Sequence, residues 1–130
     1  MPQAVVAELE SGRAQGVEVP GVSDFPWIEI RETELRPVSA AVAALGNGER
    51  EVILLALDHH ADWVILDDLE ARRQAEECGL QVIGTVGLLV SAKQKNMIAS
   101  VGTCLSALEN AGMWLSEDLK RTVLESADEL

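Results

Sequence analysis

Two adjacent acidic residues, Asp67 and Asp68, directly follow the apolar run Trp63–Leu66. A continuous apolar run bounded by charged residues predicts a strand that is covered on both faces. In parallel α/β sheets, ligands bind at the carboxyl ends of the strands, and carboxylates there can hold Mg²⁺ or Mn²⁺, which prefer oxygen ligands. A structural interpretation competes with this one, because Asp68 can instead cap the helix that is predicted to begin at Leu69. Taken alone, the two residues favour capping.

Glu49 is the second candidate for chemistry. It follows the turn Gly46-Asn47-Gly48 and lies at the start of a predicted helix over 49–60. A carboxylate at this place can reach the sheet edge that carries Asp67 and Asp68, although a first-turn acid also simply stabilises the helix dipole. We expect Glu49, Asp67 and Asp68 to converge on one edge of the sheet as catalytic and metal-binding residues.

Several other side chains are weaker candidates. The cationic residues that are placed to contact RNA phosphates are Arg72, Arg73, Lys93 and Lys95. They also fit ordinary surface charges on helices, and we favour that interpretation. The segment 58–62, which contains two histidines, fits a helix end better than a metal site, since adjacent helical residues project about 100° apart. Thr85 is expected to cap a helix, and Trp27, Trp63 and Trp114 are expected to lie in the core.

Composition limits the partners of the chain. It has 130 residues, 48% of them hydrophobic, and a formal net charge of −12. A chain this acidic repels nucleic acid at long range, so a nuclease would need a local basic patch or bound cations, and a protein partner with a basic surface fits more easily. No apolar run approaches the ~18 residues of a membrane helix. Without an apparent export signal, Cys78 and Cys104 are expected to be reduced, in a cytoplasmic protein.

The order of predicted elements indicates how the candidates are positioned. A helix is predicted over 2–13, a loop over 16–26, a strand over 27–30, and helices over 38–45 and 49–60. Strands over 63–66 and 80–83 flank a helix over 69–78 that ends at Gly79, and three helices follow over 85–95, 101–111 and 117–126. Strand, helix, strand, helix in the middle of the chain predicts an α/β fold with a short parallel sheet.

These motifs in this order resemble a branch of the PIN-domain proteins that is related to the VapC toxins. The resemblance is carried by the corner Gly46-Asn47-Gly48-Glu49, the junction Asp67-Asp68-Leu69-Glu70-Ala71-Arg72 and the turn Gly84-Thr85-Val86-Gly87-Leu88-Leu89. It extends from about Pro2 to the C-terminus and implies a single three-layer α/β/α domain over 1–130.

The resemblance also implies a chemistry. Several carboxylates of that family hold one or two divalent ions, Mg²⁺ or Mn²⁺, for the hydrolysis of RNA. Carried over by position, Glu49 matches the acid at the start of the family's third helix, and Asp67 or Asp68 matches the acid after its fourth strand. An antitoxin protein is the partner that the toxin relationship implies.

One departure from the family pattern shapes the expected function. The stretch Met1–Glu8 is similar to the family's later Pro-x-x-Val-x-x-Glu helix, so its opening strand, which ends in an aspartate, is missing here. Two hypotheses follow: a metal-dependent endoribonuclease with weak or no activity, or a catalytically dead PIN-like protein that binds a partner or itself. A parallel sheet without its central strand exposes an open edge, so we expect a homodimer or larger assembly.

Overall fold

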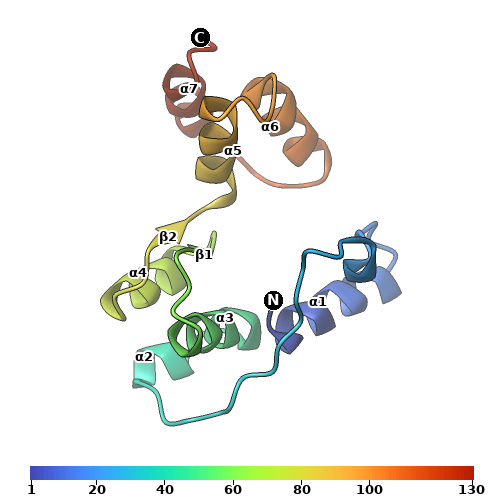
Figure 1. Ribbon diagram of the computed structural model, residues 1–130. Helices are drawn as coiled ribbons and strands as arrows, with labels where there is room; N and C mark the ends of the chain where they lie inside the picture. Colours follow the sequence, from blue (N-terminus) through green and yellow to red (C-terminus); the bar gives the residue numbers. More distant parts are fainter. The chain divides into compact units, whose positions relative to one another are not determined.

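The computed structural model describes residues 1–130 as a mixed α/β chain with one short two-stranded parallel sheet (Figure 1). This confirms the predicted fold class. By their internal contacts the residues form two compact units, 1–82 and 83–130. The first unit contains the helices α1 (Gln3–Ala14), α2 (Ala40–Ala43), α3 (Asn47–Asp58) and α4 (Leu69–Glu77), a short 3-10 turn η1 (Val22–Asp24), and the strand β1 (Val64–Ile65). Strand β2 (Val82–Ile83) ends this unit and begins the next.

The core of the first unit forms where α3 and α4 pack against one face of β1. Its buried members are Ile53, Ala56, Val64, Leu66, Ala71 and Ala75. The two alanines of α4 are fully buried, so the helix backbone itself lies close to the core. Helix α4 ends at Gly79, whose positive φ of 83° is favourable only for glycine, and Leu80 N–H donates to the Ala75 carbonyl at 3.0 Å. The predicted C-terminal cap is therefore confirmed.

The prediction that β1 is covered on both faces is wrong. Val64 and Leu66 are buried, whereas Trp63 and Ile65 are 57% and 54% exposed. Successive side chains of a strand point to opposite faces, and α3 and α4 pack on only one of them. The continuous apolar run had suggested two covered faces, but one face presents its apolar side chains to solvent.

The predicted strand over 27–30 is also absent. Ile28 N–H donates to the Phe25 carbonyl at 3.0 Å, which places Pro26 and Trp27 inside a turn. Regular pairing occurs here only as an isolated parallel bridge between Pro2 and Arg31. Four residues of alternating polarity after a proline were too few to specify a strand, because the first of them, Trp27, belongs to the turn at Pro26.

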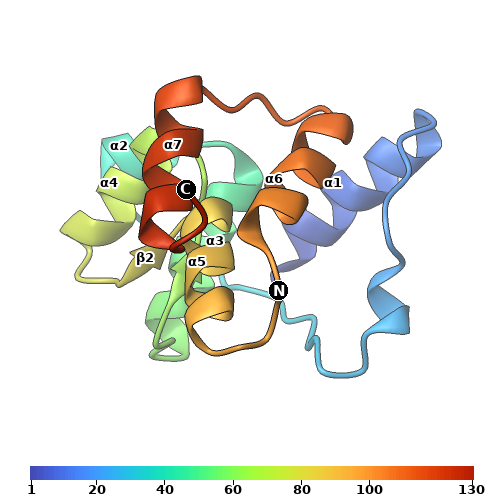
Figure 2. The same cartoon turned by 90° about the horizontal axis from the view of Figure 1, so that it is seen from above.

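The second unit is a small helical bundle of α5 (Thr85–Gln94), α6 (Val101–Asn110) and α7 (Glu117–Ser126), which pack against one another (Figure 2). Its buried core residues are Val101, Leu105, Leu115, Val123 and Ala127. Ser100 and Ser116 cap α6 and α7 by accepting backbone N–H groups at 3.1 and 3.2 Å. Gly84, and not the predicted Thr85, occupies the N-cap position of α5.

All three tryptophans are exposed, which corrects the expectation that they lie in the core. Trp27, Trp63 and Trp114 are 77%, 57% and 84% exposed. Trp27 makes an edge-on contact with Phe25, at 5.9 Å between ring centroids. Neither Cys78 nor Cys104 forms a disulfide in the structure. None of the helices combines the length and the apolar character that crossing a membrane requires.

Candidate active site

Asp68 is the N-cap of helix α4. Its backbone is extended, and its carboxylate accepts a hydrogen bond from the Ala71 N–H at 2.9 Å. This is the structural interpretation that the sequence favoured for Asp68. The neighbouring Asp67 is exposed and lies between the end of β1 and this cap. Asp68 therefore has a defined backbone partner in the folded chain.

Glu49 lies in the first turn of α3, where Gly46 leaves room for its side chain. The carboxylate folds back over Gly46, so that a Cβ placed on that residue would collide with the Glu49 Oε2 atom. Glu49 is partly buried, and its negative charge lies near the positive end of the helix dipole. The glycine corner thus allows a compact arrangement of backbone and carboxylate that a larger residue at position 46 would disturb.

A further carboxylate at this corner, that of Glu8, was not selected from the sequence. A Cβ placed on Gly48 would lie 2.6 Å from the Glu8 Oε1 atom, so the Glu8 side chain rests against the first turn of α3. Glu51 of α3 in turn accepts the Ala4 N–H of α1 at 2.9 Å. These two contacts hold the start of α1 against the first turns of α3, and they bring Glu8 close to the helix start that carries Glu49.

A sequence signal for Glu8 existed. Pro2, Val5 and Glu8 follow one another at intervals of three residues, a spacing that keeps side chains near one face of a helix. Pro2 is buried and Val5 is partly buried, so this face is turned towards α3. The first helix of the chain therefore places the Glu8 carboxylate beside Glu49 of the predicted site.

The carboxylates do not form a ready-made metal centre. No three His, Cys, Asp or Glu side chains in the structure are gathered closely enough to hold a metal ion. Glu49 belongs to the start of α3, and Asp68 to the start of α4, where its carboxylate is bound to backbone. The residues as placed do not fit a closed three-carboxylate metal group, and a site of Glu49, Asp67 and Asp68 stays a prediction.

The predicted RNA-contacting cations differ in how they are engaged. Arg73 donates to the Glu70 carboxylate at 2.9 Å, and this hydrogen bond, followed by one from Gln74, lowers the pKa of Glu70. Lys93 donates to the Ala99 carbonyl and pairs with Glu129 at 3.2 Å. Arg72 is partly buried in α4. Arg73 and Lys93 are thus paired with local acids, which agrees with the favoured interpretation as surface charges.

Glu129 forms the most strongly held carboxylate of the second unit. It accepts the Val101 and Gly102 N–H groups at 2.7 and 2.9 Å and the Ser100 hydroxyl at 3.0 Å. The backbone N–H groups of Gly102 and Val101 are the main cause that lowers the pKa of Glu129 from 4.5 to about 2, with smaller contributions from Ser100 and Lys93. Glu129 therefore anchors the end of the chain to the start of α6.

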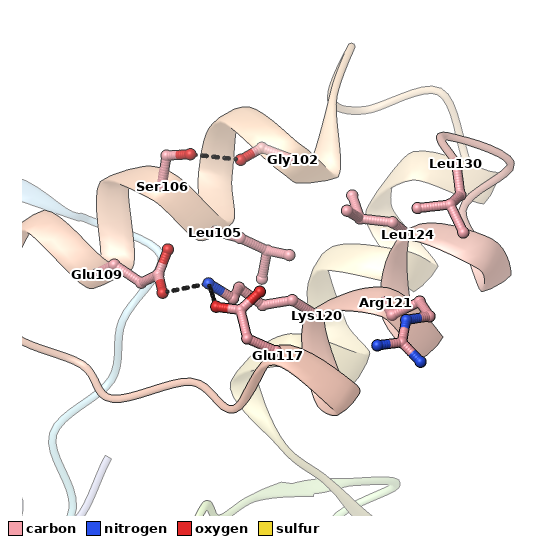
Figure 3. A pocket seen from close by; sticks show the side chains of 9 residues that line it. All are labelled: Gly102, Leu105, Ser106, Glu109, Glu117, Lys120, Arg121, Leu124 and Leu130. Carbon is pink, nitrogen blue, oxygen red and sulfur yellow. Dashed lines mark hydrogen bonds and ion pairs between the residues drawn. The ribbon is translucent and has the colours of Figure 1, made fainter.

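A cavity of about 380 Å³ lies between α6 and α7 (Figure 3). Lys120 is held there between Glu109 and Glu117, at 2.9 and 2.5 Å, and the hydrogen bonds that it donates to Glu117 and Glu109 raise the pKa of Lys120. Arg121 lies beside it and pairs with Asp118 at 3.5 Å. None of the predicted site residues lines this cavity, and its cations are already paired with acids.

Comparison with known proteins identifies the family. The family DUF3368, described as a PIN domain, matches residues 1–129. No curated protein and no solved structure gives a match. PIN domains have a nuclease-type fold, and they generally depend on divalent metal ions. The match covers the glycine corner, the Asp67-Asp68 junction and the three C-terminal helices together, and the chain belongs to the PIN-domain family.

Proposed function

We propose that this chain is a ribonuclease-type PIN-domain protein, of the kind found as the toxin of a toxin–antitoxin pair, with weak or no cleavage activity in the chain as it stands. Membership of the PIN-domain family supports the nuclease class. The observation that carries the low activity is the use of the acids: Asp68 is bound to the start of α4, and no three potential ligands are gathered.

Electrostatics supports the same proposal. With a net charge of −12 the chain lacks a general attraction for RNA. Two of the candidate cations for phosphate contact, Arg73 and Lys93, are paired with Glu70 and Glu129. RNA binding by these side chains would have to displace both acids, so we expect weak binding.

A fluorogenic RNA assay with Mn²⁺ tests the proposal. We expect turnover at or near background, and loss of any residual turnover in Asp68→Asn and in Glu49→Gln. Asp68→Asn is informative because asparagine also caps helices, so the fold is retained while the charge is removed. Clear Mn²⁺-dependent turnover that Asp68→Asn abolishes would contradict the weak-activity proposal.

Growth measurements address the toxin relationship separately. Induced production of this chain in growing bacteria is expected to leave the growth rate close to that of cells producing Asp68→Asn. Growth arrest by the unmodified chain alone, at equal protein levels, would show a strong toxin and refute the proposed weakness.

A further inference from the structure

The cavity of about 380 Å³ between α6 and α7 has the composition of a small-molecule site (Figure 3). Its volume falls in the range of ~300–1,000 Å³ that such sites occupy, and they combine apolar walls with a few polar groups. Each helix contributes an apolar side chain, Leu105 from α6 and Leu124 from α7. Leu105 is only 3% exposed, so the cavity reaches the core of the second unit. Glu109 and Lys120 supply polar groups beside this apolar wall.

The two helices that enclose the cavity are tied together at both ends. Lys120, near the start of α7, binds Glu109 near the end of α6 at 2.9 Å. Glu129, just beyond α7, accepts the Val101 and Gly102 N–H groups at the start of α6, at 2.7 and 2.9 Å. The helices are therefore antiparallel, and the cavity lies along the space between the two ties. A site that is formed in advance requires little ordering of the protein when a ligand binds.

The charges that line the cavity balance one another. Its ionisable side chains are two acids and two bases, namely Glu109, Glu117, Lys120 and Arg121. Their formal charges sum to zero, whereas the chain as a whole carries −12. Charged groups in a binding site are complementary to those of the ligand. A lining with both signs close together therefore favours a ligand that itself carries both signs.

The ion pairs of the cavity leave groups that a ligand can use. The ammonium of Lys120 has three N–H donors, two of which bind Glu109 and Glu117. The Glu117 side chain is 83% exposed, and the exposed Arg121 pairs with Asp118 at 3.5 Å. Exposed ion pairs of this kind contribute little to stability. Glu117 and Arg121 can therefore turn to a ligand at small cost, and the third donor of Lys120 is available to it.

We propose that this cavity binds a free amino acid with an aliphatic side chain, of the size of leucine. Its carboxylate binds the third N–H of Lys120 and the Arg121 guanidinium, and its ammonium binds the Glu117 carboxylate. Its side chain lies against Leu105 and Leu124 and removes apolar surface from water. An anion that lacks the ammonium leaves Glu117 without a cation, and a cation that lacks the carboxylate competes with Lys120 for the acids. Either half of the ligand alone therefore binds less well than the zwitterion.

Titration of the ¹⁵N-labelled full chain with L-leucine, followed by amide NMR, tests the proposal. For a ligand this small we expect saturable shifts with a Kd of roughly 1 mM, centred on the amides of Leu105, Lys120 and Leu124. 4-Methylpentanoate lacks the ammonium and 3-methylbutylamine lacks the carboxylate, so each should bind at least ~10-fold more weakly. No saturation by ~20 mM leucine, shifts centred elsewhere, or equal affinity for either half of the ligand would overturn the proposal.

Two variants and a matched control extend the test. Lys120→Gln removes the ammonium that binds the ligand carboxylate and should weaken leucine binding at least ~10-fold. Lys95→Gln is the control, because Lys95 is an exposed lysine of the same unit that does not line the cavity. It should bind leucine as the unmodified chain does.

Arg121→Gln keeps the test decisive if circular dichroism shows that Lys120→Gln is unfolded. The Arg121 side chain is exposed, so this variant should fold and should bind leucine about 3-fold more weakly. Unchanged affinity in a folded Lys120→Gln or in Arg121→Gln would overturn the proposed site. Equal weakening by Lys95→Gln would do the same, because it would show a general effect of charge.

Discussion

Asp68 allows a test that separates a structural acid from a catalytic one. Its carboxylate accepts one backbone N–H, from Ala71 at 2.9 Å, at the start of a nine-residue helix. Substituting an N-cap by alanine costs about 1 kcal/mol, within a range of about 0.5–2 kcal/mol, whereas asparagine caps about as well as aspartate. Asp68→Ala is therefore expected to lower the free energy of unfolding by about 1 kcal/mol, and Asp68→Asn by only a few tenths.

The measurement is urea unfolding followed by circular dichroism at 222 nm. A loss of about 1 kcal/mol corresponds to a fall in melting temperature of roughly 4 °C for a domain of this size. Asp62→Ala, at an exposed acid just before β1, serves as the control and should change stability little. If Asp68→Asn costs as much as Asp68→Ala, the charge and not the cap stabilises this junction. If neither costs anything, the hydrogen bond to Ala71 contributes nothing.

Two more outcomes follow from the structure. The pKa of Glu129 is about 2 in the folded chain, below its ordinary 4.5, so its contribution to stability is complete above pH 4.5 and disappears as the pH falls towards 2. The melting temperature of the unmodified chain should therefore fall more steeply between pH 4.5 and pH 2 than that of Glu129→Gln. Parallel curves of melting temperature against pH would contradict this. Gly48→Ala puts a Cβ 2.6 Å from the Glu8 Oε1 atom. Its helical gain, at most roughly 0.5–1 kcal/mol at this second residue of α3, should therefore appear fully only in a Glu8→Ala background. Equal gains in both backgrounds, measured by urea unfolding, would show that Glu8 does not rest there.

Helices were predictable from the sequence because their signals are local. Helix α7 spans the predicted residues 117–126, and the caps at Ser116 and Asp68 and the stop at Gly79 were all visible as residue types next to apolar periodicity. These features depend on the backbone groups of a few neighbouring residues. These local features therefore form independently of the tertiary contacts made by the rest of the chain.

The strands were less predictable because their extent depends on distant partners. The run over 63–66 predicted correctly that a strand exists, but only packing decides whether one face or two are covered, and here Trp63 remains 57% exposed. The segment over 27–30 had strand-like alternation, yet the turn at Pro26 and the bridge to Pro2 determine its backbone. The contact of Glu8 with Gly48 is likewise tertiary, since forty residues separate the two positions.

The capping role of Asp68 also limits how strongly its carboxylate can bind a cation. A cation that recruits this carboxylate away from the Ala71 N–H must offset the lost cap, which costs about 1 kcal/mol. Since 1.4 kcal/mol is tenfold in an equilibrium constant, that competition weakens binding by roughly fivefold. A factor of this size is too small to forbid a second role but large enough to be measured. Because the Asp68→Asn variant keeps the cap while losing the charge, its stability and its cleavage of RNA report on the two roles independently.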